Sequence, residues 1–229
     1  MTEEEFSIPE ITKVLIQQSQ GYNSLHKLGA SSEEGPRDTV IFKIGKRSAK
    51  LVNGVSTLSE GKNSTAIAIL GRQIVEDFIT LLWVLLDESN AQKYLDAVEA
   101  SLLKTVRLNL EEGSLSIKST KSDEDKTTEF LNSDRFDNKT KLINVEARAR
   151  EAKVYDLLYN VIYRNLSIET HGHSGMSENS DNNESDTYAY LSMIVSITRC
   201  VGFVSVNWLE HRQRTDNEIL RELLGINEI

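Results

Sequence analysis

A chain of 229 residues with 39% hydrophobic and 27% charged residues has the composition of a globular protein that buries a core without disulfides or structural metals. Its single cysteine, Cys200, excludes an intramolecular disulfide and multi-cysteine zinc sites, and we interpret it as a buried, inert thiol. The net charge of −9 argues against broad, non-specific nucleic-acid binding, which rests on neutralising phosphates, but it allows a local basic cleft.

Hydrophobic residues recur at helical spacing along most of the chain, and the only prolines are Pro9 and Pro36. Ser7 and Glu10 predict a capping box at the first helix. The β-branched residues 39–41 leave an extended segment as the alternative to a second helix. The predicted helices cover residues 8–28, 38–60, 64–87, 91–110, 139–171 (one long helix or two broken ones), 187–213 and 215–224.

Two polar stretches interrupt these helices. Residues 111–137 are rich in Glu, Ser, Lys, Asp and Thr, which predicts a surface excursion with at most a short helical turn. Residues 172–186 predict a solvated loop that starts at Gly172 as a helix stop and ends at Ser185 or Asp186 as a helix cap.

The expected architecture is a single all-α domain. We expect an antiparallel helical bundle of four principal helices at residues 61–213, an N-terminal helical extension at 1–60 and a terminal helix at 214–229, which ends at Gly225.

The sequence predicts a cytoplasmic protein without a membrane partner. Residues 66–86 and 188–209 are apolar, but both carry charges, and Arg199 lies in the middle of the second. A central charge costs ~2.5–3.5 kcal/mol on insertion, so we interpret both as core helices. The acidic N-terminus lacks the basic and apolar regions of a signal peptide.

A polar stripe marks the end of the helix predicted at 139–171. Asn160, Arg164, Ser167 and His171 are spaced by four, three and four residues, which places them on one helical face. Arg164 and His171 are two turns apart, with a rise of roughly 10.5 Å between them. The apolar residues predicted for the opposite face are Val154, Leu157, Leu158, Val161 and Ile162. Guanidinium and imidazole groups aligned in this way indicate a phosphate-handling site.

The stretch from Tyr163 to Gly172 resembles the active motif of the HEPN superfamily, in which an Arg and a polar residue are followed by a His. Here Asn165 follows Arg164, and six residues separate Arg164 from His171, the long end of the family's range.

An earlier segment strengthens the resemblance. Residues 68–76, with Arg72 and Glu76, are similar to the Arg-x-x-x-Glu helix of a prokaryotic HEPN-like branch that also carries a Tyr-Arg-x-Leu-Ser sequence, here Tyr163 to Ser167. The similarity covers roughly residues 60–210, with a variable stretch in the middle.

The resemblance implies a metal-independent endoribonuclease without a cofactor, typical of toxin–antitoxin and antiviral defence systems. Such an enzyme cleaves RNA, for example tRNA, through the 2′-OH to leave a 2′,3′-cyclic phosphate. It implies His171 as the proton-transfer residue, Arg164 as the phosphate binder and Asn165 as an orienting group. It also implies a homodimer whose composite cleft holds two Arg and two His, and a neutralising antitoxin or other protein partner.

A second hypothesis comes from the net charge. In it the chain is a non-catalytic helical dimer, an adaptor that binds a protein or a nucleotide, and Arg164, Ser167 and His171 are the solvated side of a helix.

The helix before the motif also leaves alternatives open. Arg72 and Glu76 form either an ion pair within their helix or a buried support for Arg164 or His171, and Asp77 is expected to be solvated.

Three further groups of residues are candidates for binding sites. A metal site at His171 and His173 is disfavoured, since the candidate carboxylates Asp181 and Glu184 lie in a polar loop. The basic residues Lys43, Lys46, Arg47 and Lys50 form either an RNA-facing patch or a solvated helix face. Trp83 and Trp208 are expected in the core or a dimer interface.

Overall fold

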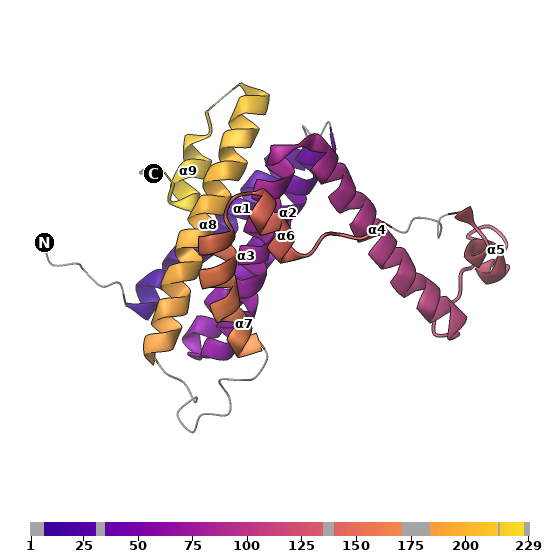
Figure 1. Ribbon diagram of the computed structural model, residues 1–229, viewed down its shortest axis with the longest axis horizontal. Coiled ribbons are helices and arrows are strands. Elements are labelled where there is room, and N and C mark those ends of the chain that lie inside the picture. Colours follow the sequence, from indigo (N-terminus) through magenta and orange to yellow (C-terminus); the bar gives the residue numbers. More distant parts are fainter. Residues whose placement is uncertain (1–6, 31–34, 135–139, 171–183, 215, 227–229) are drawn as a thin grey trace, which may run out of the picture.

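The computed structural model describes residues 7–30, 35–134, 140–170, 184–214 and 216–226, which form an all-α bundle (Figure 1). In chain order the helices are α1 (Ile8–Ala30), α2 (Pro36–Glu60), α3 (Ser64–Leu86), α4 (Glu88–Glu111), α5 (Thr127–Leu131), α6 (Val145–Glu151), the π-helix η2 (Tyr155–Tyr163), α7 (Arg164–Thr170), α8 (Glu184–Gln213) and α9 (Glu218–Leu224). This confirms the predicted fold class.

Helix α3 lies at the centre of the bundle and packs against α2, α4, α6, η2, α7 and α8. Its apolar residues point in several directions, and Ile67, Ile74 and Trp83 are almost fully buried. Tyr22 of α1 and Phe42 of α2 belong to the same core cluster. The first two helices, expected as an N-terminal extension, therefore contribute to the core that also holds α3 and α8.

Several helix ends agree with the sequence. The Glu10 carboxylate accepts hydrogen bonds from the Ser7 N–H and hydroxyl, each at 2.7 Å, and the first of these is the glutamate half of the predicted capping box. Helix α9 ends at Gly225, whose φ of 67° is a left-handed conformation that suits glycine. Residues 39–41 are helical, so the extended alternative is wrong. Ser185 and Asp186 lie inside the first turn of α8 and not at its cap.

The segment 139–171 was expected to form one or two helices, and its described part, 140–170, forms three. Residues 140–144 are not helical, and α6 begins after Asn144, whose side chain accepts a hydrogen bond from the Ala147 N–H at 2.8 Å. Lys153, with a left-handed φ of 58°, separates α6 from η2. The π-helical hydrogen bonds of η2 join residues five apart instead of four, so this segment departs from α-helical periodicity.

Helix α4 leaves the body of the bundle and carries α5 near its far end (Figure 1). Only four of its residues are buried, and Val98, Leu102 and Leu108 are 47%, 64% and 49% exposed. Between the end of α4 and Ser133, the described part of the predicted excursion contains only the short α5 as helix, as expected.

Among the described residues, α8 is the only helix long and apolar enough to cross a membrane, a test that core helices also pass. It packs against α1, α2, α3 and α9, as a core helix does. Cys200 on this helix is exposed, so the prediction of a buried thiol is wrong. Apolar residues occur on most sides of α8, and periodicity alone could not tell which side of it faces outward.

Candidate functional site

Arg164 is the first residue of α7, directly after the π-helix, and its side chain is exposed. Its Nη1 donates a hydrogen bond to Asn160 Oδ1 at 3.0 Å, and its guanidinium lies 5.6 Å from the centroid of the Tyr159 ring. Asn160 and Asn165 are exposed as well. Three of the predicted site residues therefore reach solvent on the same short segment, while His171 lies outside the described residues.

The predicted polar stripe is divided between two sides of the segment. Ser167 is partly buried, and its hydroxyl accepts a hydrogen bond from Arg72 Nε at 3.1 Å. Leu157 and Val161, assigned to a buried face, are 62% and 49% exposed. This part of the prediction is wrong because it assumed α-helical phase through residues 155–163, where the hydrogen bonds are π-helical.

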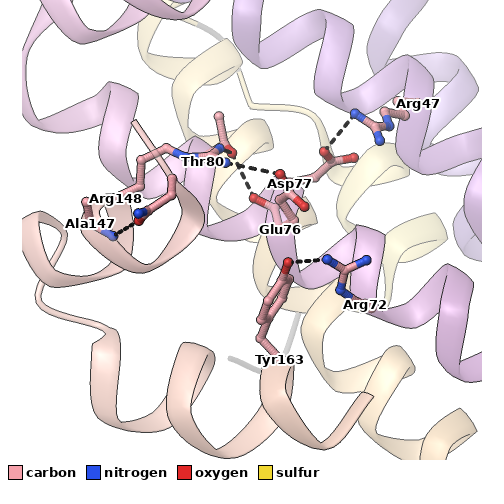
Figure 2. Close-up of polar contacts among 9 residues, drawn as sticks. Arg47, Arg72, Glu76, Asp77, Thr80, Ala147, Arg148 and Tyr163 are labelled. Carbon is pink, nitrogen blue, oxygen red and sulfur yellow. Dashed lines mark hydrogen bonds and ion pairs between the residues drawn. The ribbon is translucent and has the colours of Figure 1, made fainter. Parts of the chain in front are cut away.

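Arg72 of α3 forms hydrogen bonds with residues that precede and follow Arg164 in the sequence. Its Nη2 donates to the Tyr163 hydroxyl at 2.5 Å (Figure 2). Its Nε donates to the Ser167 hydroxyl. The Arg72 guanidinium also lies 4.8 Å from the centroid of the Tyr163 ring. Arg72 thus bonds to the residues one before and three after Arg164, which fixes the junction of η2 and α7 against α3.

Glu76 has its own partner, Arg148 of α6. Arg148 Nη2 lies 3.0 Å from Glu76 Oε1, and Arg148 Nη1 donates to Thr80 Oγ1 (Figure 2). The Arg148 residue is 2% exposed. An ion pair between Arg72 and Glu76 within α3 was therefore the wrong alternative. Arg72 bonds to η2 and α7, whereas Glu76 bonds to α6. Arg72, Glu76 and Thr80 are spaced by four residues, and this polar stripe was the available sequence signal for a buried cation.

Asp77 is buried, with 2% of the residue exposed, so its predicted solvation is wrong. Arg47 of α2 approaches it, with 3.3 Å between Arg47 Nη1 and Asp77 Oδ1 (Figure 2). Burial raises the pKa of Asp77 to about 7; Arg47 opposes this rise and Glu76 adds to it. Lys43, Lys46, Arg47 and Lys50 of α2 are all exposed, but the Arg47 guanidinium reaches the buried Asp77 carboxylate.

A glycine allows the site segment to approach the core closely. A Cβ at Gly71 would lie 2.8 Å from Ile194 Cδ1 of α8 and 3.6 Å from Leu166 Cδ1 of α7. Leu166, between Arg164 and Ser167 in the chain, is fully buried. Gly71 therefore permits α3, α7 and α8 to meet directly beneath the exposed Arg164.

Sequence reasoning missed a stack of aromatic rings beside Arg164. Tyr155 and Tyr159 have ring centroids 5.4 Å apart and an interplanar angle of 23°, and Tyr159 and Tyr163 have values of 5.3 Å and 17°. Arg150 lies over Tyr155, 3.6 Å from the ring centroid. The spacing of four between the tyrosines was the available signal, since such residues are neighbours on a helix.

The described residues contain no group of three or more His, Cys, Asp or Glu side chains that could hold a metal ion. His171, His173 and Asp181 lie outside the described residues, so the metal-free expectation stays a prediction.

The residues of this site fall within a single family match. The model of a family of unknown function, DUF5677, matches residues 38–188, from α2 to the beginning of α8. The chain belongs to this family. The DUF5677 region contains Arg72, Glu76, Arg148, Arg164 and His171. No curated protein and no solved structure matches the chain, so the function of this DUF5677 member is argued from its own residues.

Proposed function

We propose that the protein is a metal-independent endoribonuclease with Arg164 and His171 at its active centre. The observation that carries the proposal is the exposed Arg164, whose neighbours Tyr163 and Ser167 are held by partly buried hydrogen bonds from Arg72. A guanidinium held in this way suits the charge that develops on a phosphate during cleavage. The resemblance of this segment to the HEPN motif supports the same assignment.

The proposed reaction uses the 2′-OH of RNA as the nucleophile. The 2′ oxygen attacks the adjacent phosphorus, the bond from phosphorus to the 5′ oxygen breaks, and a 2′,3′-cyclic phosphate remains. The 2′-OH loses its proton to a base and the 5′ oxygen gains one, and His171 is assigned to this proton transfer. Asn165 orients the substrate beside Arg164.

A homodimer is part of the proposal. Leu157, Val161 and Ile168 are 62%, 49% and 50% exposed on the segment that carries Arg164. Arg164 lies between Val161 and Ile168 in the sequence, so two copies packed through these side chains bring two arginines to one cleft. Val161→Glu is expected to produce a monomer in light scattering and to lower cleavage, whereas Leu102→Glu on the α4 arm leaves the mass of the dimer unchanged.

The test is RNA cleavage in EDTA with total tRNA and a single-stranded RNA. Relative to the wild type, His171→Ala is expected to lose ~10²–10⁴-fold and Arg164→Ala ~10²–10³-fold in rate. His211→Ala and Arg107→Ala are matched controls, because both residues are exposed and lie on α8 and α4, away from the motif segment. Equal cleavage by wild type and His171→Ala, or by wild type and Arg164→Ala, refutes the assignment.

The net charge of −9 favours a second function, a non-catalytic adaptor with the same fold. If the wild type is a stable dimer and cleaves neither the tRNA nor the single-stranded RNA in that assay, the adaptor is supported. Cleavage with cyclic-phosphate ends that depends on His171 excludes it.

A further inference from the structure

Three tyrosine rings of η2 and one arginine beyond each end of the helix form a stack of planar side chains. The Tyr155, Tyr159 and Tyr163 rings stack at 5.4 and 5.3 Å with interplanar angles of 23° and 17°. Arg150 of α6 covers one end at 3.6 Å from the Tyr155 centroid, and Arg72 of α3 covers the other at 4.8 Å from the Tyr163 centroid. Five side chains from three helices thus form one stack.

The two ends of the stack differ in exposure. Tyr163 is 8% exposed and Arg72 is partly buried, so that end is part of the interior. At the other end 55% of the Arg150 side chain is exposed, and Tyr155 and Tyr159 are half-buried. Only the Arg150 end can therefore receive another planar group.

Glu146 holds the exposed end in place. Its Oε1 accepts hydrogen bonds from Arg150 Nη2 at 2.7 Å and Nε at 3.2 Å, while its Oε2 accepts from the Tyr159 hydroxyl at 3.5 Å. These contacts keep the Arg150 guanidinium over Tyr155, where its exposed side offers a flat cationic surface. Arg164 lies beside the same rings, 5.6 Å from the Tyr159 centroid.

We propose that Arg150, Tyr155, Tyr159 and Arg164, here called the stacking strip, bind single-stranded RNA next to the cleavage site. A base stacks on the exposed face of the Arg150 guanidinium, which Tyr155 and Tyr159 hold in place from behind, and stacking on a guanidinium plane tolerates any base. A duplex keeps its bases stacked inside the helix and cannot offer them to the strip. The proposal rests on the proposed ribonuclease function, because it identifies the substrate class of the site at Arg164.

The charges of the strip predict how binding responds to salt. Arg150 and Arg164 are its two cations, and Glu146 is bonded to the first of them. Two phosphates neutralised on a single strand give a slope of about −1.4 for log K against log salt. A nucleic-acid site built mainly on phosphate contacts would have a much steeper slope, which the net charge of −9 disfavours.

Binding is measured by fluorescence anisotropy with a labelled 2′-O-methyl decamer, which cannot be cleaved because its 2′ oxygen is blocked. The wild type is expected to bind the single strand, to bind its duplex at least ~10-fold more weakly, and to give the shallow salt slope. Stacking is worth ~1–3 kcal/mol per base, and the base stacks on the exposed face of Arg150. Tyr155→Leu and Tyr159→Leu remove the rings that hold this guanidinium in place, so each is expected to lower affinity by up to roughly 5- to 150-fold. Tyr155→Phe keeps the ring and stays within about 2-fold.

A second pair of variants separates stacking from charge. Tyr155→Leu leaves the salt slope unchanged, whereas Arg164→Gln makes it shallower by ~0.7. Arg150→Gln, at an exposed position, serves as the alternative if either leucine variant has a lowered melting temperature. The proposal is overturned if the folded Tyr155→Leu and Tyr159→Leu variants bind with unchanged affinity. It is also overturned if the wild type binds the duplex and the single strand equally well.

The outcomes also distinguish this proposal from the ribonuclease itself. Tyrosine-dependent binding without cleavage of natural RNA refutes the nuclease and keeps the strip as a binding site. Cleavage that depends on His171 while the leucine variants bind as the wild type does keeps the nuclease and refutes the strip.

Discussion

Replacing Arg148 by methionine tests the polar contacts that hold α6 and the motif segment on α3. Arg148 is 3% exposed in its side chain, and its Nη2 lies 3.0 Å from Glu76 Oε1. Removing one partner of a buried ion pair costs ~3–5 kcal/mol, because the other charge stays in the interior. The Glu76 side chain is 26% exposed and regains part of its hydration, so we expect the lower end, about 3 kcal/mol.

The assay is equilibrium urea unfolding, with thermal melts as a second readout. For a chain of this length ~1 kcal/mol corresponds to ~2–4 °C, so the melting temperature should fall by roughly 6–12 °C. Arg150→Met is the matched control, since its ion pair with Glu146 is 55% and 37% exposed and such pairs contribute ~0–1 kcal/mol. The two arginines are two residues apart on the same helix and differ in burial.

A double-mutant cycle then measures the pair itself. Combining Arg148→Met with Glu76→Gln should cost less than the sum of the single changes, with a coupling energy of at least ~1 kcal/mol. The reasoning fails if Arg148→Met lowers the free energy of unfolding no more than Arg150→Met does. It also fails if the losses caused by Arg148→Met and Glu76→Gln simply add, because the ion pair then does not anchor α6.

Three further changes test other parts of the site region. Burial raises the pKa of Asp77 from 3.8 to about 7, so the folded protein retains a proton that the unfolded chain loses as pH rises. The free energy of unfolding of the wild type should therefore fall by up to ~1.4 kcal/mol per pH unit between about pH 4 and 7. When it is measured by urea unfolding at pH 5, 6 and 7, the free energy of unfolding of Asp77→Asn should fall less steeply with pH. Gly71→Val pushes against Ile194 and should cost ~1–3 kcal/mol, whereas Gly61→Ala, 3.8 Å from its nearest neighbour, should change stability little; equal unfolding midpoints would contradict this. Tyr163→Phe removes a hydroxyl that accepts from the α3 guanidinium and should cost ~1 kcal/mol in urea unfolding and reduce cleavage; an unchanged rate would show that this contact does not position the site.

The sequence was sufficient for the helices whose signals are local. Ser7 and Glu10 are three residues apart, and the cap they form depends on little else. Gly225 ends α9 in the left-handed conformation that only glycine adopts without strain. Such features are contained in a few neighbouring residues, and for this reason the all-α class and most helix boundaries could be predicted.

The site region could not be predicted to the same depth, because its contacts are distant in sequence. Arg148 bonds Glu76 across 72 residues, and nothing near Arg148 marks it as buried. The π-helix of η2 shifts the phase of every side chain from Tyr155 to Tyr163, so the α-helical pattern placed Leu157 and Val161 on the wrong side. Periodicity assumes one kind of helix, and it fails where tertiary packing selects another.

The distribution of arginines bears on whether an acidic protein can have the proposed RNA-cleaving function. Around the site Arg47 pairs with Asp77 between α2 and α3, while Arg72 and Arg148 bond to Tyr163 and Glu76 and hold η2 and α6 against α3. These buried or inward-facing cations build the site and add little to the attraction of phosphate in solution. Arg150 and Arg164 remain at the surface, beside rings that offer stacking in place of charge. With a net charge of −9, the stacking strip predicts an affinity for RNA that depends weakly on salt and strongly on Tyr155 and Tyr159. A steep salt dependence together with insensitivity to both tyrosines would mean that RNA, if it binds, binds elsewhere on the molecule.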